Sequence, residues 1–312
     1  MTRDRIQEGA GSGQAWRLGT VASAGRPVTV FETAGTLYLL DALIAKAGTV
    51  TPGQTGVLEV IEQWDTWRPI LTTLAANAAG VQPLERDRLE WLPAIPNPRK
   101  IVCVGVNYRD HLAEMGSGAV RPERPFAFIK PQNTLLGHRQ TLWLPPVTRK
   151  VDWEAELAII IGRKAFQVAA KDALKVVAGY CPFNDISARD WIADLVPGLG
   201  QDWILHKSFD GFGPLGPLVT PAEFVRDPQN LAIRLSVNGE VKQDSSTANM
   251  VFDIASIIEY FSSVMTLMPG DIIATGTPAG VGHGRGEYLK DGDKVSLSIE
   301  CLGELDTEVR RR

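Results

Sequence analysis

The stretch VDWEAELAIIIG, residues 151–162, places acidic side chains directly before the most apolar part of the chain. Its first half predicts a β-strand, and successive side chains on a strand point to opposite faces. Asp152, Glu154 and Glu156 therefore share one face. The continuation is apolar at every position, which is typical of a strand buried on both sides. Carboxylates that enter such a strand need a partner to stay ionised.

Two kinds of partner meet this requirement: basic side chains and a divalent cation. Two carboxylates at positions i and i+2, with a third from elsewhere, offer the hard oxygen ligands that Mg²⁺ and Mn²⁺ prefer. The ordinary alternative for such a string is an exposed edge with a solvated acidic face, and the apolar continuation counts against it. The residues alone leave both basic partners and a cation open.

Three further segments place polar side chains beside apolar or glycine-rich ones. Asp185 in CPFNDISARDW follows an apolar approach, and its ordinary role would be to cap the helix start behind it. Lys207 precedes a loop rich in Gly and Pro, HKSFDGFGPLGP. The segment GDIIATGTPAGVG ends a predicted strand in a glycine loop containing Thr275 and Thr277. Exposed N–H groups in such a loop suit an anion, and a plain turn would have the same sequence.

The organisation of the chain follows from its length and its prolines. The 312 residues exceed the usual single domain, and the proline-rich stretch WLPAIPNPRK suits an extended connector. We therefore predict a small α/β N-terminal domain over residues 1–95 and a larger domain over residues 96–312. Strand patterns dominate the larger part, so the expected fold class is α+β and rich in β-structure.

Local signals place several elements. Asn238-Gly239 between alternating segments predicts a two-residue hairpin turn. Asp253 is expected to cap a helix over residues 254–268, which has apolar side chains at helical spacing and ends at Pro269-Gly270. A second helical pattern, over residues 57–80, is expected to break at Pro69.

Composition restricts the location and the partners. The cysteines Cys103, Cys181 and Cys301 are far apart and lie in apolar contexts, which is typical of reduced thiols in a cytoplasmic protein. The N-terminus lacks the apolar core of a signal peptide, and no run is long enough to span a membrane. A formal net charge of −4 and scattered basic residues argue against a nucleic-acid partner.

Six segments in this order closely resemble the fumarylacetoacetate hydrolase family: GVNYRDHLAEMG, VDWEAELAIIIG, FNDISARD, HKSFDGFGPLGP, VNGEVKQDSSTANMVFDIASIIEYFS and LMPGDIIATGTPAGVG. The resemblance covers roughly residues 98–309. It implies a mixed β-roll catalytic domain, preceded by a small N-terminal domain like residues 1–95, and it implies a homodimer.

The resemblance also implies roles for particular residues. The proposed ligands of Mg²⁺ or Mn²⁺ are Glu154, Glu156 and Asp185, and the proposed catalytic residues are His111, Glu114 and Lys207. The proposed substrate-binding residues are Arg189, Gly276 and Thr277. Asp152 lies outside the family's ligand set, so we expect it either to contact the metal ligands without binding the ion or to form an ion pair. Residues 116–125, rich in Gly and Pro, are expected to hinge a lid that closes over the substrate.

The activity that the resemblance implies is metal-dependent hydrolysis of a carbon–carbon bond in a 2,4-dioxo acid of the acylpyruvate or fumarylpyruvate type. The metal would stabilise the departing enolate, and His111 with Glu114 would activate the attacking water. Alternatives in the family are decarboxylation of oxaloacetate, hydration or isomerisation of related 2-oxo acids, and cleavage of diketo deoxy-sugar acids. An organic-acid binding protein without catalysis is the alternative from another class. Ile192 stands where some acylpyruvate hydrolases carry Gln, a departure that bears on the hydrogen bond of that Gln and on the choice of substrate.

Overall fold

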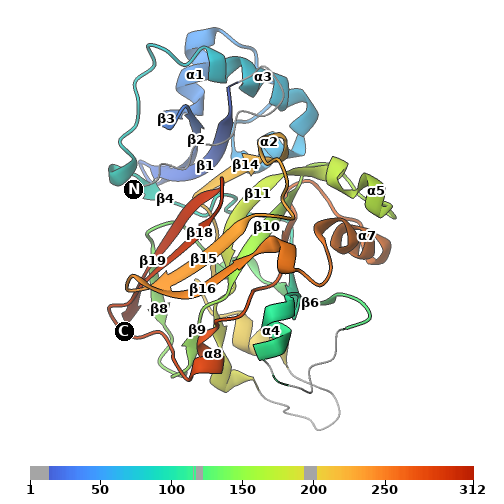
Figure 1. Cartoon of the computed structure of the whole chain (residues 1–312). Coiled ribbons are helices and arrows are strands. Elements are labelled where there is room, and N and C mark those ends of the chain that lie inside the picture. Colours follow the sequence, from blue (N-terminus) through green and yellow to red (C-terminus); the bar gives the residue numbers. More distant parts are fainter. Residues whose placement is uncertain (1–13, 115, 117–121, 193–201) are drawn as a thin grey trace.

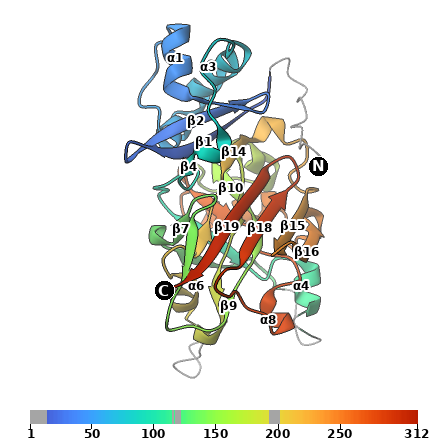
Figure 2. The same cartoon turned by 90° about the vertical axis from the view of Figure 1, so that its left-hand side faces the viewer.

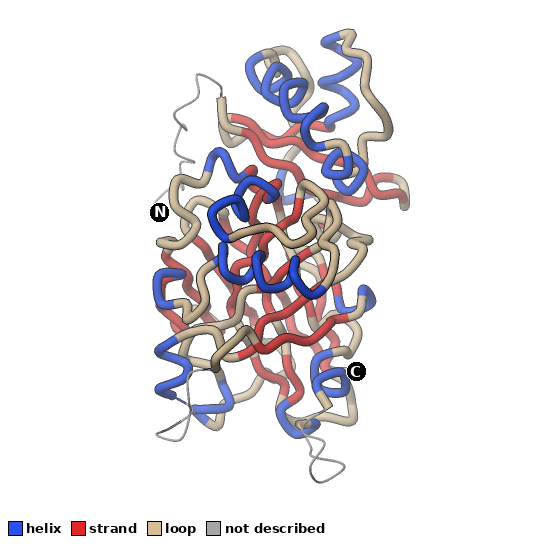
Figure 3. The backbone as a smooth tube through the Cα atoms, turned by 90° about the vertical axis from the view of Figure 1, so that its right-hand side faces the viewer, coloured by secondary structure: helices blue, strands red, loops and turns tan. Residues whose placement is uncertain are grey.

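The computed structural model describes residues 14–114, 116, 122–192 and 202–312. Half of the predicted lid hinge, residues 117–121 of 116–125, lies outside these ranges. Figure 3 shows that strands form the body of the molecule and that helices lie around it. The fold is α+β and rich in strands, as the sequence predicts. No helix among the described residues combines the length and apolarity needed to cross a membrane.

The N-terminal part contains a small antiparallel sheet and three helices (Figure 1). Its elements are β1 (Trp16–Ser23), β2 (Arg26–Thr33), β3 (Thr36–Leu39), α1 (Leu40–Ala47), α2 (Val57–Glu62), α3 (Trp64–Ala76) and β4 (Glu90–Trp91). The helical pattern breaks at Gln63, between α2 and α3, and not at Pro69. Pro69 lies inside α3, where the remaining hydrogen bonds and the buried Trp67 and Leu71 hold the helix together.

The N-terminal strands continue into the largest sheet. This sheet has ten strands in the order β3-β2-β1-β14-β11-β10-β17-β5-β6, and β4 pairs with β1 outside that path. The junction is the antiparallel pairing of β1 with β14, in which Leu18 lies opposite Val219. The other strands of this sheet are β5 (Ile101–Gly105), β6 (Phe126–Lys130), β10 (Ala155–Ile161), β11 (Val177–Asn184), β14 (Leu218–Pro221) and β17 (Ile272–Ala274).

A five-stranded sheet packs against β10 of the large sheet, and Figure 2 shows its outer face. Its order is β16-β15-β18-β19-β8, formed by β8 (Thr141–Leu144), β15 (Ala232–Val237), β16 (Glu240–Ser246), β18 (Lys294–Ile299) and β19 (Gly303–Arg311). The predicted hairpin turn joins β15 to β16, and Asn238 and Gly239 have φ of 53° and 83°. Both values lie in the left-handed region that Asn and Gly tolerate best.

The remaining elements are short and lie mostly near the site. They are α4 (Arg109–Glu114), β7 (Leu135–Leu136), β9 (Val151–Asp152), α5 (Ala170–Ala173), β12 (Ser187–Ala188), α6 (Trp203–Lys207), β13 (Gly213–Pro214), α7 (Ile254–Val264) and α8 (Gly282–Arg285). Asp253 caps α7, as predicted, by accepting a hydrogen bond from the N–H of Ser256. The helix ends at Val264, before the predicted end, and Val264 is exposed.

Strand β10 is buried on both faces, as its apolar run predicts. Leu157, Ile159 and Ile161 belong to the core beneath the five-stranded sheet and α7. Ala158 and Ile160 belong to a second core, which includes apolar residues of α1, α2 and α3. Both faces of β10 are therefore covered by apolar side chains. Cys103 and Cys181 are buried thiols outside any disulfide, as predicted, whereas Cys301 is only partly buried.

Candidate metal and catalytic site

The acidic segment does not form one continuous strand. It is interrupted between β9 and β10, at Trp153 and Glu154. The N–H of Glu154 donates to Asn184 Oδ1 at 2.9 Å, and the N–H of Ala155 donates to Gln243 Oε1 at 2.9 Å. Side-chain amides thus replace the carbonyls of a neighbouring strand. This is the physical reason why the strand is interrupted at this point.

Glu154, Glu156 and Asp185 converge at the end of this interrupted strand. One carboxylate oxygen from each residue lies within 4.8 Å of the others, and all three side chains are buried. The pairing of β10 with β11 places Ala155 opposite Asn184 and so carries Asp185 beside Glu154. The N–H of Asp185 donates to the backbone oxygen of Glu154 at 2.9 Å. The structure therefore brings together the three predicted metal ligands.

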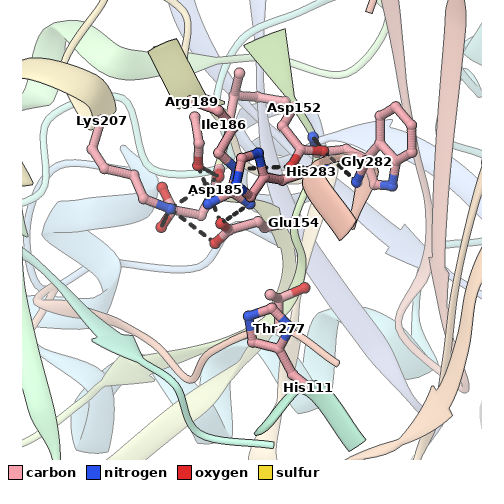
Figure 4. Close-up of polar contacts among 12 residues, drawn as sticks. His111, Asp152, Glu154, Asp185, Ile186, Arg189, Lys207, Thr277, Gly282 and His283 are labelled. Atoms are coloured by element: carbon pink, nitrogen blue, oxygen red, sulfur yellow. Dashed lines mark hydrogen bonds and ion pairs between the residues drawn. The ribbon is translucent and has the colours of Figure 1, made fainter. Parts of the chain in front are cut away.

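Basic side chains surround two of these carboxylates (Figure 4). Lys207 Nζ lies 2.8 Å from both Glu154 Oε2 and Asp185 Oδ2. Arg189 contacts Glu154 Oε1 at 2.6 Å through Nη2 and Asp152 Oδ2 at 2.8 Å through Nε. Asp152 is thus an ion-pair partner of Arg189, one of the two roles expected for it. Its oxygens also accept hydrogen bonds from the N–H groups of residues 282 and 283.

A second buried lysine, which the sequence analysis did not identify, completes the cluster. Lys130, the last residue of β6, forms a short ion pair with Asp185 Oδ1 and donates to the backbone oxygen of Ile186 at 3.2 Å. A single lysine after an apolar strand carries no sequence signal of such a role. Four carboxylates thus face three basic groups, leaving one net negative charge: Asp152, Glu154, Glu156 and Asp185 against Lys130, Arg189 and Lys207.

The pKa shifts in the cluster show which group lacks compensation. Burial raises the pKa of Glu154, but the charges of Lys207 and Arg189 outweigh burial and hold it well below its ordinary value. For Glu156, burial and the negative charges of Asp185 and Glu154 raise the pKa well above its ordinary value. Glu156 has no basic side chain in hydrogen-bond contact among the described residues; the one hydrogen bond found for its side chain comes from the N–H of Gly276, at 2.8 Å.

This donor set fits a divalent cation. Three converging carboxylates are the oxygen ligands that Mg²⁺ and Mn²⁺ take, and a cation beside Glu156 would supply the missing positive charge. Arg189 contacts only Glu154 of the three predicted ligands, so arginine does not neutralise the set. Burial lowers the pKa of Lys207, but Asp185 and Glu154 raise it above its ordinary value, so Lys207 stays a protonated donor.

We expect Glu156→Gln to stabilise the metal-free protein by roughly 1–3 kcal/mol at neutral pH. The folded-state pKa of Glu156 lies above its unfolded value. Its contribution to stability is therefore complete below about pH 4.3 and is lost as the pH rises toward the folded pKa. The amide is neutral at every pH, and its oxygen can still accept from the N–H of Gly276.

Urea unfolding in chelator at several pH values measures this difference, which should grow as the pH rises above about 4.3. Addition of Mn²⁺ should stabilise the wild type and leave Glu156→Gln almost unchanged, because one ligand is missing. A variant that is less stable than the metal-free wild type at neutral pH would show that Glu156 is already compensated.

The predicted His–Glu pair forms on α4. His111 Nδ1 lies 3.0 Å from Glu114 Oε2, across one turn of the helix. The other oxygen, Glu114 Oε1, accepts from the N–H of Gly280 at 3.0 Å, and Gly284 of α8 packs directly against this carboxylate. The charge of His111 also contributes to the lowered pKa of Glu154, so the imidazole lies within electrostatic range of the acidic cluster. Figure 4 shows its position relative to Glu154.

Glu114 is held in its ionised form. Burial raises its pKa, but the hydrogen bonds from His111 and from the N–H of Gly280 lower it, with a net value below the ordinary one. Asp110 fixes the same helix, since its Oδ1 accepts from the N–H of Ala279 at 3.4 Å and its Oδ2 from Ser245 Oγ at 2.6 Å. An ionised Glu114 in contact with Nδ1 orients the imidazole, which is the arrangement of a general base.

The glycine loop after β17 closes the site. Gly276 has φ of 93°, and a Cβ there would lie 2.8 Å from the Cβ of Asn107, so only glycine fits. Its N–H contacts Glu156, and a role in binding substrate stays a prediction. Thr277 is buried, and its Oγ1 accepts from Gln243 Nε2 at 2.8 Å. Gln243 was not predicted, because the string VKQDSS looks like an ordinary exposed strand edge.

The comparisons with known proteins agree with this geometry. A sequence profile described as fumarylacetoacetate (FAA) hydrolase, C-terminal, matches residues 100–310. A mitochondrial oxaloacetate tautomerase of Bos taurus is 40% identical over 255 residues, which are 81% of this chain and 79% of that protein. A mitochondrial oxaloacetate tautomerase of Homo sapiens is 42% identical over 236 residues, 75% of this chain and 74% of that one.

Solved structures give the same result. A fumarylacetoacetate hydrolase from the psychrophilic Exiguobacterium antarcticum has a TM-score of 0.80 and 34% identity, covering 96% of this chain and 100% of that one. A maleylpyruvate hydrolase from Sphingobium sp. SYK-6, in complex with manganese(II) and pyruvate, has a TM-score of 0.76 and 30% identity, covering 95% and 99%. The chain described here belongs to the fumarylacetoacetate hydrolase family.

Proposed function

We propose that this protein is a metal-dependent enzyme that interconverts the keto and enol forms of a 2-oxo dicarboxylic acid, with oxaloacetate as the substrate. The observation that carries the proposal is the pairing of one general base, His111 with Glu114, with a buried set of three carboxylates beside it. Relatives at 40–42% identity that are oxaloacetate tautomerases support the same reaction.

Glu154, Glu156 and Asp185 would hold the Mg²⁺ or Mn²⁺ ion. When bound, this ion supplies a Lewis acid that polarises the 2-oxo group and lowers the cost of removing a proton from the neighbouring carbon. His111 takes that proton from carbon 3, and Glu114 stabilises the imidazolium that results. The imidazolium then returns a proton to the oxygen, so a C–H bond breaks and an O–H bond forms. Lys207 stays protonated and contributes positive charge near the developing oxyanion.

Carbon–carbon hydrolysis of an acylpyruvate, the activity first expected from the resemblance, is the second candidate. The maleylpyruvate hydrolase among the structural relatives supports it. Hydrolysis requires a positioned water in addition to the base, whereas tautomerisation requires the base alone. Ile192 is half-buried and has no side-chain hydrogen-bonding group. Ile192 therefore favours tautomerisation, which needs fewer polar contacts than hydrolysis. Decarboxylation of oxaloacetate would use the same metal ligands and the same base as tautomerisation.

The decisive experiment compares three reactions of one preparation with Mg²⁺ or Mn²⁺. We expect the enol form of oxaloacetate, followed by its ultraviolet absorbance, to decay faster with enzyme than without it. Acetylpyruvate cleavage and carbon dioxide release from oxaloacetate should be much slower. Faster acetylpyruvate cleavage would instead establish the hydrolase, and binding without any turnover would establish an organic-acid binding protein. A cytoplasmic location and a homodimer remain parts of the proposal drawn from the sequence.

A further inference from the structure

Gln243 is a fully buried amide on β16 that joins three segments around the site. Its Oε1 accepts from the N–H of Ala155, at the start of β10, at 2.9 Å. Its Nε2 donates to Thr277 Oγ1 and to the backbone oxygen of Pro278, both at 2.8 Å. All of these contacts lie between the proposed metal ligands and the glycine loop.

The backbone dictates which way this amide faces. The N–H of Ala155 can only donate, and the carbonyl of Pro278 can only accept. A rotated amide would place its NH₂ group against the first and its oxygen against the second, leaving buried groups unpaired at a cost that the fold avoids. The NH₂ group of Gln243 therefore faces Thr277.

This orientation fixes the chemistry of the Thr277 hydroxyl. A hydroxyl has one hydrogen to donate and two lone pairs to accept with. Gln243 occupies a lone pair, and no acceptor for the Thr277 hydrogen is found among residues 14–114, 116, 122–192 and 202–312. Thr277 is 4% exposed, so bulk water is a poor alternative acceptor. Its hydrogen is available to a ligand that enters the site, and Figure 4 shows where the side chain lies relative to His111 and Glu154.

We infer that Gln243 is a positioning residue that presents the Thr277 hydroxyl as a hydrogen-bond donor to an anionic ligand group, a carboxylate of the 2-oxo acid. This inference rests on the proposed function and deepens it, because it names the residue that gives the loop its preference for an anion. A donor fixed in advance loses little freedom when the ligand binds, and a hydrogen bond to a charged oxygen is stronger than one to a neutral oxygen.

Calorimetric binding of oxalate, an unreactive dicarboxylate, tests the inference on the Mg²⁺-loaded protein. Thr277→Val should weaken binding about tenfold or more, and Thr277→Ser should retain it, because a hydrogen bond to a charged group has this magnitude. Gln243→Glu should weaken binding at least as much, because its carboxylate takes the Thr277 hydrogen for itself. In kinetics with oxaloacetate, Thr277→Val and Gln243→Glu should raise KM and alter kcat little, and Thr277→Ser should leave both constants near the wild-type values.

Gln229 provides a matched control. Its amide also joins two backbone groups, the N–H of Ile254 at 2.9 Å and the oxygen of Thr247 at 2.7 Å, and it makes no contact with the site residues described above. Gln229→Glu should leave the oxalate affinity unchanged. If thermal unfolding shows that Gln243→Glu does not fold, Gln243→Leu and the two Thr277 variants carry the test.

The outcomes separate this inference from the function on which it rests. A wild type that binds oxalate, together with Thr277→Val or a folded Gln243 variant that binds equally well, overturns the inference alone. A wild type that binds no oxalate overturns both, because the Thr277 donor then has no anion to receive. Weakened binding in Thr277→Val and Gln243→Glu, with unchanged binding in Thr277→Ser and Gln229→Glu, confirms it.

Discussion

His111→Asn should lower kcat for the enolisation of oxaloacetate by about a hundred- to ten-thousand-fold, because it removes the one general base of the proposed mechanism. Asn is a smaller polar residue that leaves the helix α4 and its contacts with the glycine loop in place. KM should change little, since the proposed contacts with the substrate carboxylates come from other residues. Steady-state kinetics with saturating Mg²⁺ measures both constants.

Glu114→Gln is the companion variant for this prediction, with a smaller expected loss. The amide can preserve the hydrogen bond from the N–H of Gly280 through its oxygen, but it no longer stabilises a protonated imidazole. We expect a loss of kcat of about tenfold or more, smaller than the loss in His111→Asn. If His111→Asn keeps the wild-type kcat, another group removes the proton and the mechanism proposed here is wrong.

Removal of the divalent ion should lower the rate by a similar factor. A Lewis acid contributes several kcal/mol to such a reaction, so chelation should lower the rate by about a thousandfold, and Mg²⁺ or Mn²⁺ should restore it. The raised pKa of Glu156 adds a pH dependence. A proton and the ion compete for this carboxylate, so the apparent affinity for the ion should rise as the pH increases.

Titration of activity with Mn²⁺ at several pH values measures this dependence. Asp185→Asn should weaken binding of the ion in the same assay. Asp190→Asn is the control and should leave ion binding unchanged, because Asp190 accepts hydrogen bonds from Thr148 and Arg149. Full activity after exhaustive chelation would contradict the metal requirement. An affinity for the ion that falls as the pH rises would contradict the role given to Glu156.

The sequence predicted the parts of the fold and the site that depend on local pattern. The apolar run of β10 required burial on both faces, and the structure places its alternate residues in two cores. The Asp253 cap and the Asn238-Gly239 turn are short-range features, and both formed as expected. The apolar continuation predicted that the acids of residues 152–156 need buried partners, which is a rule that does not require knowledge of the fold. The grouping of Glu154 and Glu156 with Asp185 came from the family resemblance.

Three of the missed features depend on contacts between distant segments. The strand breaks before Ala155 because amides from positions 184 and 243 take its hydrogen bonds. Lys130 reaches Asp185 only because β6 ends at the site, and nothing near Lys130 in the sequence indicates this. Pro69 remains inside a helix because the buried face of α3 compensates for one lost hydrogen bond. Local propensity predicts none of these outcomes.

The pairing of β1 with β14 has a consequence for engineering. The match to the family begins at residue 100, yet β1 is hydrogen-bonded to β14 of the catalytic sheet. Trp16 of β1 also packs in the same core as Ile160 of β10. A truncated chain that began at residue 100 would leave β14 as an unpaired edge strand and would expose apolar side chains behind the metal ligands. The N-terminal segment is therefore a structural part of the catalytic region, and it cannot be removed as a separate accessory.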